Sequence, residues 1–310
     1  MKVLIVCSGN SRSGRFRLEI DKPYVYEQVE AIRRQFDVEF DFFLINGRGI
    51  RGYLSNLTAL REKVQHDRFD IVHAHYGNSG FLSIMQKSVP VVITFHGSDI
   101  DLLSGRVLSK IAMKMSVFNI FVTQRLAEKA RAKGNFAVIS CGVDLDKTFP
   151  VDVAEARRRT GLDPGKKYAL FSSSFGNPDK NYELARRAAE LVGNIDLLEL
   201  SGFTREQVNL LMNAVDLLIV TSLHESGPLV VKEAVACGCP VVSVDVGDVR
   251  EIIGGIQGCY LTSYDPADIA AKMSAVLGSG ARTNDRNRIL SFDNKEIARK
   301  VYDVYARYAS

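Results

Sequence analysis

Residues 216–244, DLLIVTSLHESGPLVVKEAVACGCPVVSV, constrain the fold more than any other segment. Residues 216–222 are mostly apolar and β-branched, a run long enough for a strand and too short for a helix. A polar loop follows, and then a helix that the sequence bounds with Pro228 at its first residue and Gly238 just beyond its last. Residues 241–244 predict a second apolar strand. Because strands are apolar throughout when helices cover both faces of a parallel sheet, the segment predicts part of an α/β fold.

Two glutamates in this segment are candidate ligand contacts. Glu225 lies in the loop at the carboxyl end of the first strand, next to a helix N-terminus. Ligands bind at this edge of open α/β sheets, and a helix N-terminus favours anions. Glu233 shares a helix face with Leu229 and Ala236, and a carboxylate on an apolar face must be paired, hydrogen-bonded or bound to a ligand. A structural salt bridge and a ligand contact both satisfy that requirement.

The pattern Glu225-x7-Glu233, followed by EAVACGCPVV and VGDVREII, resembles the retaining glycosyltransferases of family four. The resemblance is specific over residues 196–265 and fainter elsewhere. It implies an α/β protein of the GT-B fold, in which two Rossmann-like parallel-sheet domains face each other across a cleft. The implied acceptor-side domain comprises residues 1–147 and is joined by the C-terminal helix, 293–310. Residues 148–292 would form the domain that binds the nucleotide sugar.

The resemblance also assigns roles to the residues around the two glutamates. In the family, the first glutamate contacts hydroxyls of the donor sugar at the reacting centre, and the second contacts the ribose of the nucleotide. These roles are implied here for Glu225 and Glu233. Carboxylates accept hydrogen bonds from vicinal hydroxyls, and helix-start amides bind phosphate. The donor sugar and diphosphate would lie near the helix start, which comprises Ser226, Gly227, Pro228 (which has no amide hydrogen) and Leu229.

Residues 91–100, VVITFHGSDI, predict a buried strand that ends at His96. Glycine and two polar residues follow it, which makes His96 a site candidate, with a core or capping role as the alternative. The resemblance implies that His96 lies near donor sugar and acceptor and organises the reacting groups. His73 and His75 share a face of a neighbouring strand, so three histidines could bind zinc. No metal is expected, because no carboxylate stands at zincin spacing.

The loop after the first predicted strand, residues 8–14, is rich in small residues that let backbone approach a ligand closely. Its pattern does not fit the dinucleotide-binding fingerprint GxGxxG. The resemblance places this loop under the donor diphosphate and beside the acceptor, and implies a donor contact for Gly9. Asn10, Arg12 and Arg15 are candidate contacts to the acceptor or its phosphate, or else parts of a solvated loop.

The loop that closes the first strand of the second series, FSSSFGNPDKN, contains Lys180. Family members carry an arginine and a lysine in this loop, both on the donor phosphates, and Lys180 matches the lysine. Phe175 occupies the arginine position, and an aromatic ring cannot supply that charge. A second departure is length, because residues 195–200 run directly into the next helix. We therefore expect the second sheet to lack one strand.

Strand and helix patterns alternate from end to end, which predicts α/β architecture throughout. The polar segment 144–150 is interpreted as the interdomain linker, and residues 295–308 predict a final helix. The predicted strands are Lys2–Cys7, Val38–Ile45, Ile71–Ala74, Val91–Phe95, Asn119–Val122 and Ala137–Ser140, then Tyr168–Ser172, Ile195–Leu200, Leu217–Thr221, Val241–Val244 and Cys259–Leu261.

Composition favours a globular protein of the cytoplasm. The chain is 46% hydrophobic and 25% charged, and its five cysteines are scattered without zinc-like spacing, which suits a reducing compartment. The apolar run in MKVLIVCSG stops after six residues, so we expect a first strand rather than a signal peptide or a membrane span.

Basic residues are concentrated in the first half of the chain. Residues 1–150 hold 21 lysines and arginines against 15 acids, whereas residues 151–310 hold 19 against 21. The first half could face an anionic membrane surface, which would place the protein peripherally on the inner membrane face, or a phosphate-linked acceptor. A solvated surface with no partner explains the charge equally well. Nucleic acid is not expected, because no binding motif occurs.

Three functional hypotheses follow. The first is a metal-independent, cofactor-free enzyme of polysaccharide biosynthesis that transfers a hexose-like sugar from a nucleotide sugar to a hydroxyl of a saccharide or lipid-linked saccharide, with retention. The second is a nucleotide-sugar epimerase, which needs an acid/base pair beyond His96. The third is a non-catalytic binding subunit, favoured by Phe175 and opposed by Lys180, Glu225 and Glu233 together. A hydrolase is not expected, since no nucleophile elbow or separated acid pair occurs.

Overall fold

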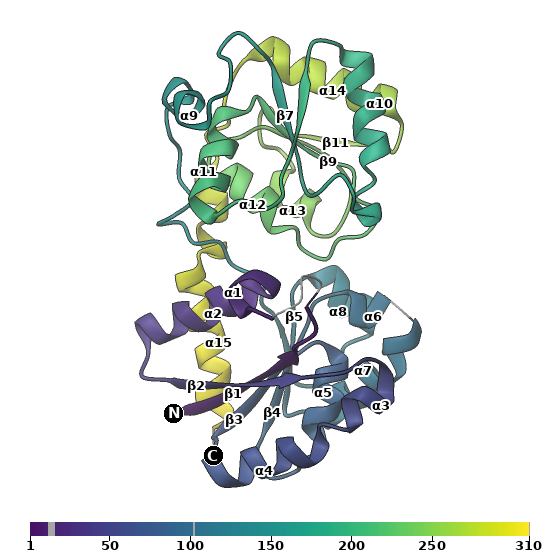
Figure 1. Cartoon of the computed structure of the whole chain (residues 1–310), viewed down its shortest axis with the longest axis vertical. Coiled ribbons are helices and arrows are strands. Elements are labelled where there is room, and N and C mark those ends of the chain that lie inside the picture. The colour runs from purple at the N-terminus through teal and green to yellow at the C-terminus, as the bar shows by residue number, and fades with distance from the viewer. Residues whose placement is uncertain (12–15, 102, 310) are drawn as a thin grey trace. The chain divides into compact units, whose positions relative to one another are not determined.

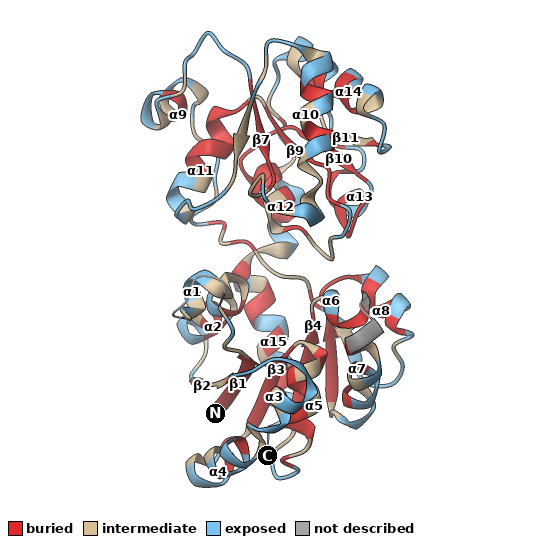
Figure 2. Ribbon diagram, turned by 45° about the vertical axis from the view of Figure 1, so that its right-hand side comes forward, coloured by how far each residue is buried: buried red, intermediate tan, exposed pale blue. Residues whose placement is uncertain are grey.

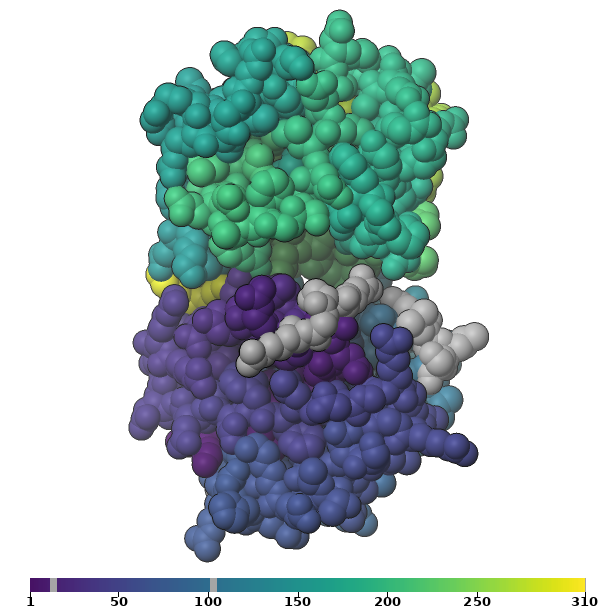
Figure 3. Space-filling model, viewed as in Figure 1, coloured from purple at the N-terminus to yellow at the C-terminus, as the bar shows by residue number. Residues whose placement is uncertain are grey.

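The computed structural model describes residues 1–11, 16–101 and 103–309. These residues form two compact units, each with a parallel sheet and helices on its faces (Figure 1). The first unit comprises residues 1–142 and 294–310, and the second comprises residues 143–293. Purple and dark blue atoms from the early part of the chain cover the first unit in the space-filling view, and teal and green atoms cover the second (Figure 3).

The described part of the first unit contains a six-stranded parallel sheet with strand order β2-β1-β3-β4-β5-β6. Its strands are β1 (Lys2–Ser8), β2 (Glu39–Ile45), β3 (Ile71–His75), β4 (Val91–Phe95), β5 (Phe118–Phe121) and β6 (Phe136–Val138). Its helices are α1 (Leu18–Asp21), α2 (Pro23–Gln35), α3 (Gly49–Leu54), α4 (Leu57–Asp67), α5 (Gly77–Ile84), α6 (Ser98–Asp101), α7 (Leu103–Met115), α8 (Gln124–Ala130) and α15 (Asn294–Tyr308).

Successive side chains along a strand point to opposite faces of the sheet, which divides the core of the first unit into two layers. Val3 and Ile5 of β1 pack with α2 and α15, whereas Leu4 and Val6 pack with α4, α5, α7 and α8. The central strands are buried along their whole length (Figure 2). Because helices cover both faces, most side chains of the central strands are apolar.

The described part of the second unit contains a five-stranded parallel sheet with strand order β11-β10-β9-β7-β8. Its strands are β7 (Tyr168–Phe171), β8 (Asp196–Glu199), β9 (Leu217–Val220), β10 (Val241–Val244) and β11 (Tyr260–Thr262). Its helices are α9 (Val153–Thr160), η1 (Pro178–Lys180), α10 (Tyr182–Val192), α11 (Arg205–Ala214), α12 (Leu229–Ala236), α13 (Val249–Ile253), α14 (Pro266–Ser279) and η2 (Arg286–Phe292).

Two local predictions need correction. Pro228 is the N-cap of α12 rather than its first residue, because its ψ of 109° is extended, while Gly238 has the left-handed φ of 69° predicted beyond the helix end. Residues 144–150 are not a free linker, since Leu145 is buried in the core of the second unit. Arg286 also donates hydrogen bonds to the carbonyls of Leu145 and Thr148, which fixes the segment to that unit.

The C-terminal helix α15 completes the first unit through a buried hydrogen bond. The Tyr305 hydroxyl lies 2.5 Å from Nδ1 of His73 on β3, and both side chains are inaccessible to solvent. His73 Nε2 lies 2.7 Å from the hydroxyl of Thr94 on β4. The polar contact therefore joins α15 to two central strands within an otherwise apolar layer.

Replacing Tyr305 with phenylalanine is expected to destabilise the protein. The change leaves a buried ring nitrogen of His73 without its partner, which costs about 1–3 kcal/mol of unfolding free energy. Urea denaturation of Tyr305→Phe measures that loss. Tyr302→Phe is the matched control on the same helix, because the Tyr302 ring stacks on Phe36 and keeps that contact as phenylalanine. Equal stability of the two variants would contradict the assignment.

Candidate functional site

Polar and aromatic side chains converge where β3 and β4 of the first unit end. His96 directly follows β4, and its Nε2 lies 3.0 Å from Nδ1 of His75 at the end of β3. The His96 ring lies between two tyrosine rings, 4.8 Å from Tyr24 and 4.7 Å from Tyr76 by centroid. The hydroxyls of these tyrosines lie 2.6 Å apart. The imidazole is therefore held on three sides by defined neighbours.

Burial sets the ionisation of this cluster. It lowers the pKa of His96 to about 3, with a further contribution from the positive charge of Lys22, so the imidazole is neutral near pH 7. Burial also raises the pKa of Asp99 to about 6, although the backbone amides of Gly77 and Gly97 donate hydrogen bonds to its two carboxylate oxygens at 2.9 Å. A neutral His96 suits a role in orienting hydroxyl groups.

The zinc alternative does not fit the three histidines. Both ring nitrogens of His73 are already engaged, by Tyr305 and by Thr94, so neither is available to a metal. No group of three histidine, cysteine or acidic side chains in the described ranges has a geometry that could hold a metal ion. His73 is thus a structural residue that connects β3, β4 and α15.

A polar cavity of about 280 Å³ opens at this edge of the first sheet. It is lined by Ser8, Lys22, Tyr53, Tyr76, Asn78, Ser98, Asp99 and Gly105. Ser8 ends β1 and Tyr76 directly follows β3, so part of the lining lies at the strand ends where ligands bind in parallel sheets, and helices α3, α5 and α7 supply much of the rest. The cavity lies beside the histidine cluster, because Tyr76 contributes to both.

The structure gives Gly9 a packing role next to this cavity. Its amide donates a hydrogen bond to the carbonyl of Ile45, and a Cβ there would come within 3.0 Å of the Leu44 Cβ. Asn10 donates its side-chain amide to the carbonyl of Gly47 at 2.8 Å, so both residues tie the β1 loop to β2. Arg12 and Arg15, the other two candidates of this loop, lie outside the described residues.

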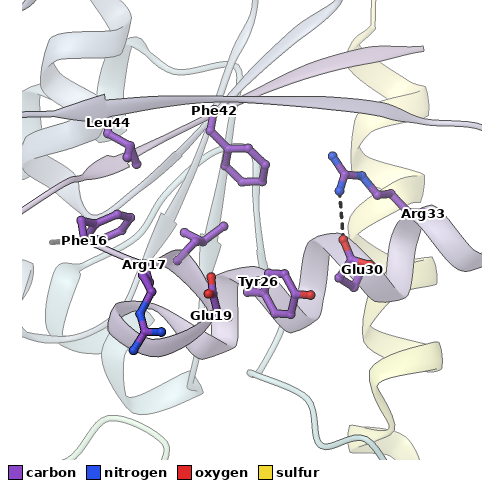
Figure 4. Close-up of a pocket in the computed structure, with 9 residues that line it drawn as sticks. Phe16, Arg17, Glu19, Tyr26, Glu30, Arg33, Phe42 and Leu44 are labelled. Carbon is purple, nitrogen blue, oxygen red and sulfur yellow. Dashed lines mark hydrogen bonds and ion pairs between the residues drawn. The ribbon is translucent and has the colours of Figure 1, made fainter.

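A second, more open groove of about 820 Å³ runs along β2, with Phe42 and Leu44 on one wall and Tyr26 of α2 on the other (Figure 4). Residues Phe16–Glu19 line its end, and an ion pair between Glu30 and Arg33 at 2.9 Å borders it. This groove is not apparent from the sequence, because α2 and β2 bring its walls together only in the folded unit.

The second unit brings Lys180 and Glu225 together at the carboxyl edge of its sheet. The Lys180 ammonium forms a hydrogen-bonded ion pair with Glu225 Oε1, and both side chains are largely buried. Ser222 at the end of β9 donates a hydrogen bond to the same carboxylate oxygen at 2.9 Å. Thr221 holds the lysine loop in place by donating to the carbonyl of Lys180. Residues 45 positions apart therefore form one charged cluster.

Glu233 forms a salt bridge, which was one of the two expectations for it, with a partner that the sequence did not indicate. Its Oε1 lies 2.6 Å from a guanidinium nitrogen of Arg205, and Glu233 is only 7% exposed. Arg205 is the first residue of α11, directly after the N-cap Thr204, which forms a capping box with Gln207. The capping-box pattern in the sequence marks the start of α11. It does not indicate that the Arg205 side chain contacts Glu233 on α12.

The helix start at residues 226–229 is braced by a glycine turn and a buried ion pair. Gly247 has a φ of 60°, and a Cβ there would come within 2.5 Å of the Ser226 carbonyl oxygen. Lys232 on α12 is fully buried and pairs with Asp248 at 3.0 Å. Burial raises the pKa of Asp248, and the charge of Lys232 opposes that shift. The backbone of Gly227, Pro228 and Leu229 is thereby held against residues 246–248.

Phe175 serves the packing of the Lys180 loop. Its ring stacks on Tyr182 with centroids 4.1 Å apart and contacts Phe171 at 5.6 Å. Its amide donates a hydrogen bond to Glu199 Oε1 at 2.7 Å. The residue at the usual arginine position therefore provides aromatic contacts and no cation.

The chain matches two protein-family models. The model described as Glycosyltransferase Family 4 matches residues 3–147, and the model described as Glycosyl transferases group 1 matches residues 173–279. The chain belongs to glycosyltransferase family 4. The first model covers the first sheet together with His96. The second model covers Lys180, Glu225 and Glu233.

Relatives of this family-4 chain include D-inositol 3-phosphate glycosyltransferases. The protein from Geodermatophilus obscurus is 30% identical over 280 residues, covering 70% of this chain and 62% of the relative. The protein from Mycobacterium sp. (strain JLS) is 28% identical over 280 residues, covering 73% and 64%. The chain therefore spans less than two thirds of the length of these relatives.

Solved structures identify the fold as GT-B. Sucrose-phosphate synthase from Thermosynechococcus elongatus superposes with a TM-score of 0.78 at 17% identity, covering 99% of this chain and 98% of that one. Anabaena HepE in complex with UDP gives a TM-score of 0.77 at 15% identity, covering 99% and 100%. The predicted fold class, two parallel-sheet α/β domains of the GT-B type, is confirmed. No helix in the described ranges is both long and apolar enough to cross a membrane.

Acidification is expected to destabilise the first unit through its buried histidines. Burial lowers the pKa of His73 to about 3 and that of His75 well below 6.5, so both stay neutral while folded. The unfolded chain binds their protons below pH 6.5 and the folded chain does not. Each histidine therefore removes about 1.4 kcal/mol of unfolding free energy per pH unit as the pH falls below 6.5.

Nitrogen-15 spectra of the imidazole rings test this expectation directly. The rings of His73 and His75 should keep their neutral signature at pH 5.5, and urea midpoints should fall between pH 7 and pH 5.5. A protonated His73 in the folded protein at pH 5.5 would contradict the assignment.

Proposed function

We propose that the protein is a glycosyltransferase that moves a sugar from a nucleotide-sugar donor to a hydroxyl of a saccharide or lipid-linked acceptor, with retention of anomeric configuration. The observation that carries the proposal is the cluster of Lys180, Glu225 and Ser222 beside the start of α12. A diphosphate is an anion that a lysine and helix-start amides stabilise, and a carboxylate accepts hydrogen bonds from sugar hydroxyls.

The two ion pairs of the second unit suggest how the donor is bound. Lys180 pairs with Glu225, and Arg205 pairs with Glu233. A donor diphosphate would attract Lys180 and leave Glu225 for the hydroxyls of the sugar. Glu233 would accept hydrogen bonds from the ribose while it stays paired with Arg205. Gly9 and residues 226–229 would supply close backbone contacts.

The first unit would supply the acceptor side. His96, neutral and held by His75 and two tyrosines, would orient the reacting hydroxyl groups without acting as general base. Asn10 donates a hydrogen bond to Ser8, a residue of the polar cavity, and would contact the acceptor. Arg12 and Arg15 follow in the same loop and are proposed to contact an acceptor phosphate on sequence grounds alone. No metal or other cofactor is required by this arrangement of charges.

Nucleotide binding tests the donor site by thermal shift. One nucleoside diphosphate should raise the melting temperature of the parent protein, because a ligand that binds only the folded state stabilises it by about 2.7 kcal/mol at a hundredfold excess over Kd. The shift should be lost in Lys180→Ala and Glu233→Gln. Lys166→Ala is the matched control, because Lys166 is an exposed lysine of the same unit that pairs with Asp196.

The outcome separates the three hypotheses. A shift lost in both site variants and kept in the control supports the transferase. Transfer with retention would then appear as an α-linked product from an α-linked donor, whereas an epimerase would interconvert nucleotide sugars without acceptor. No shift with any nucleotide would favour a non-catalytic subunit.

We further propose that helix α7 contacts an anionic membrane surface. Val107, Ile111 and Met115 are 65%, 40% and 59% exposed and recur at every fourth residue, so they form one apolar face. Arg106, Lys110 and Lys114 recur with the same spacing directly beside them. An exposed apolar face next to a row of cations is typical of a helix that lies in the membrane interface. The protein would then be cytoplasmic and peripheral on the inner membrane face.

Vesicle co-sedimentation tests the membrane contact. The double variant Lys110→Glu, Lys114→Glu should bind vesicles that contain phosphatidylserine about tenfold or more weakly than the parent, since each cation near such a surface contributes about 1 kcal/mol. Lys133→Glu, Lys300→Glu is the charge-matched control, because both lysines are exposed in the same unit. Equal loss in both double variants would show a general charge effect and contradict a contact through α7.

A further inference from the structure

An apolar cavity of about 350 Å³ lies between α3, α5 and α7 of the first unit. It is lined by Gly49, Ile50, Tyr53, Leu54, Asn78, Phe81, Leu82 and Leu108. Asn78 and the Tyr53 hydroxyl are its polar groups, and the remaining side chains are aliphatic or aromatic. Ile50 and Leu54, 55% and 38% exposed, form its rim. The cavity therefore suits an apolar group that enters from solvent between α3 and α7.

This apolar cavity adjoins the polar cavity at the carboxyl edge of the sheet. Tyr53 and Asn78 line both cavities, so the same two side chains form the wall between them. The Asn78 amide oxygen is buried and makes no hydrogen bond within the described ranges. A Cβ at Gly105, another residue of the polar cavity, would come within 3.7 Å of that oxygen. A buried acceptor of this kind requires a donor, and a ligand hydroxyl would supply one.

We propose that the acceptor is an amphiphile whose hydroxyl-bearing head occupies the polar cavity and whose apolar chain occupies the cavity between α3, α5 and α7. The inference rests on the proposed transferase function and specifies the acceptor class. Asn78 would accept a hydrogen bond from the head, and Phe81, Leu82 and Leu108 would contact the chain. A wholly polar acceptor would leave these apolar walls in contact with water.

The polar cavity gives the head a defined chemical environment. Lys22 and Asp99 supply one positive group and one acid on its walls, and Tyr76 links the cavity to the ring of His96. A head with several hydroxyls can satisfy such a mixed lining, whereas a bare hydrocarbon cannot. The two adjacent cavities together therefore select a molecule that is polar at one end and apolar at the other.

A series of alkyl β-D-glucosides with methyl, butyl and hexyl chains, used below micellar concentrations, tests the inference. Their Kd values are measured by calorimetry or by ligand-observed NMR. Affinity should rise about fourfold for each methylene that enters the cavity, which is the fold-change expected from burial of one CH₂ group. The rise should stop when the chain fills the cavity.

Variants at the exposed rim of the apolar cavity test the inference without disturbing the buried core of the unit. Ile50→Glu and Leu54→Glu place a carboxylate at exposed positions of the rim and should abolish the dependence on chain length while leaving the affinity for the methyl glucoside unchanged. Leu191→Glu is the matched control, because Leu191 is an exposed apolar residue of α10 that does not line this cavity. It should retain the full dependence.

Glucoside binding and nucleotide binding are measured independently, so failure of the amphiphile site can be distinguished from failure of the donor site. Equal affinity for all chain lengths, or a dependence that persists in both rim variants, would overturn the inference. Failure of every glucoside to bind while a nucleotide still shifts the melting temperature would also overturn it and leave the donor site intact. A chain-length dependence without nucleotide binding would support the amphiphile site and count against the transferase.

Discussion

A buried ion pair between Lys232 and Asp248 determines the geometry around the helix start of the second unit. Lys232 is fully buried, and removal of one partner from such a pair costs about 3–5 kcal/mol because the other charge stays behind unpaired. The pair joins α12 to residues 246–248, and Gly247 lets that segment approach the Ser226 carbonyl closely. The position of the α12 N-terminus, and with it the charge cluster beside it, depends on this contact.

The charge clusters at the edges of the two sheets differ in a way that matches their proposed partners. In the second unit, cations and carboxylates neutralise one another and can exchange partners with a charged donor. In the first unit, burial keeps His96 neutral and two tyrosine rings contact it, which suits a neutral hydroxyl group of the acceptor. Parallel strands bring both clusters to strand ends, because the strand interiors are covered by helices on both faces.

Sequence reasoning located the strands because periodicity and composition are local. All eleven predicted strands occur, with ends that differ by a few residues where hydrogen bonding rather than composition decides them, as at β6. The capping box at Thr204 and the left-handed Gly238 were likewise readable from neighbouring residues. Local signals could not reveal the partner of Glu233, since Arg205 stands 28 residues away on another helix. Leu145 looked like part of a polar linker because its burial depends on the rest of the second unit.

The path of the chain through the two units affects the order in which they can fold during synthesis. The first unit contains β1 but also needs α15, whose residues are synthesised after those of the second unit. Until Tyr305 leaves the ribosome, His73 lacks its hydroxyl partner and the α2 face of the first sheet is exposed. The second unit, residues 143–293, is continuous and emerges complete before that point. Although domains usually fold in the order in which they emerge, here the second unit can finish first, and the first unit closes only once α15 has emerged.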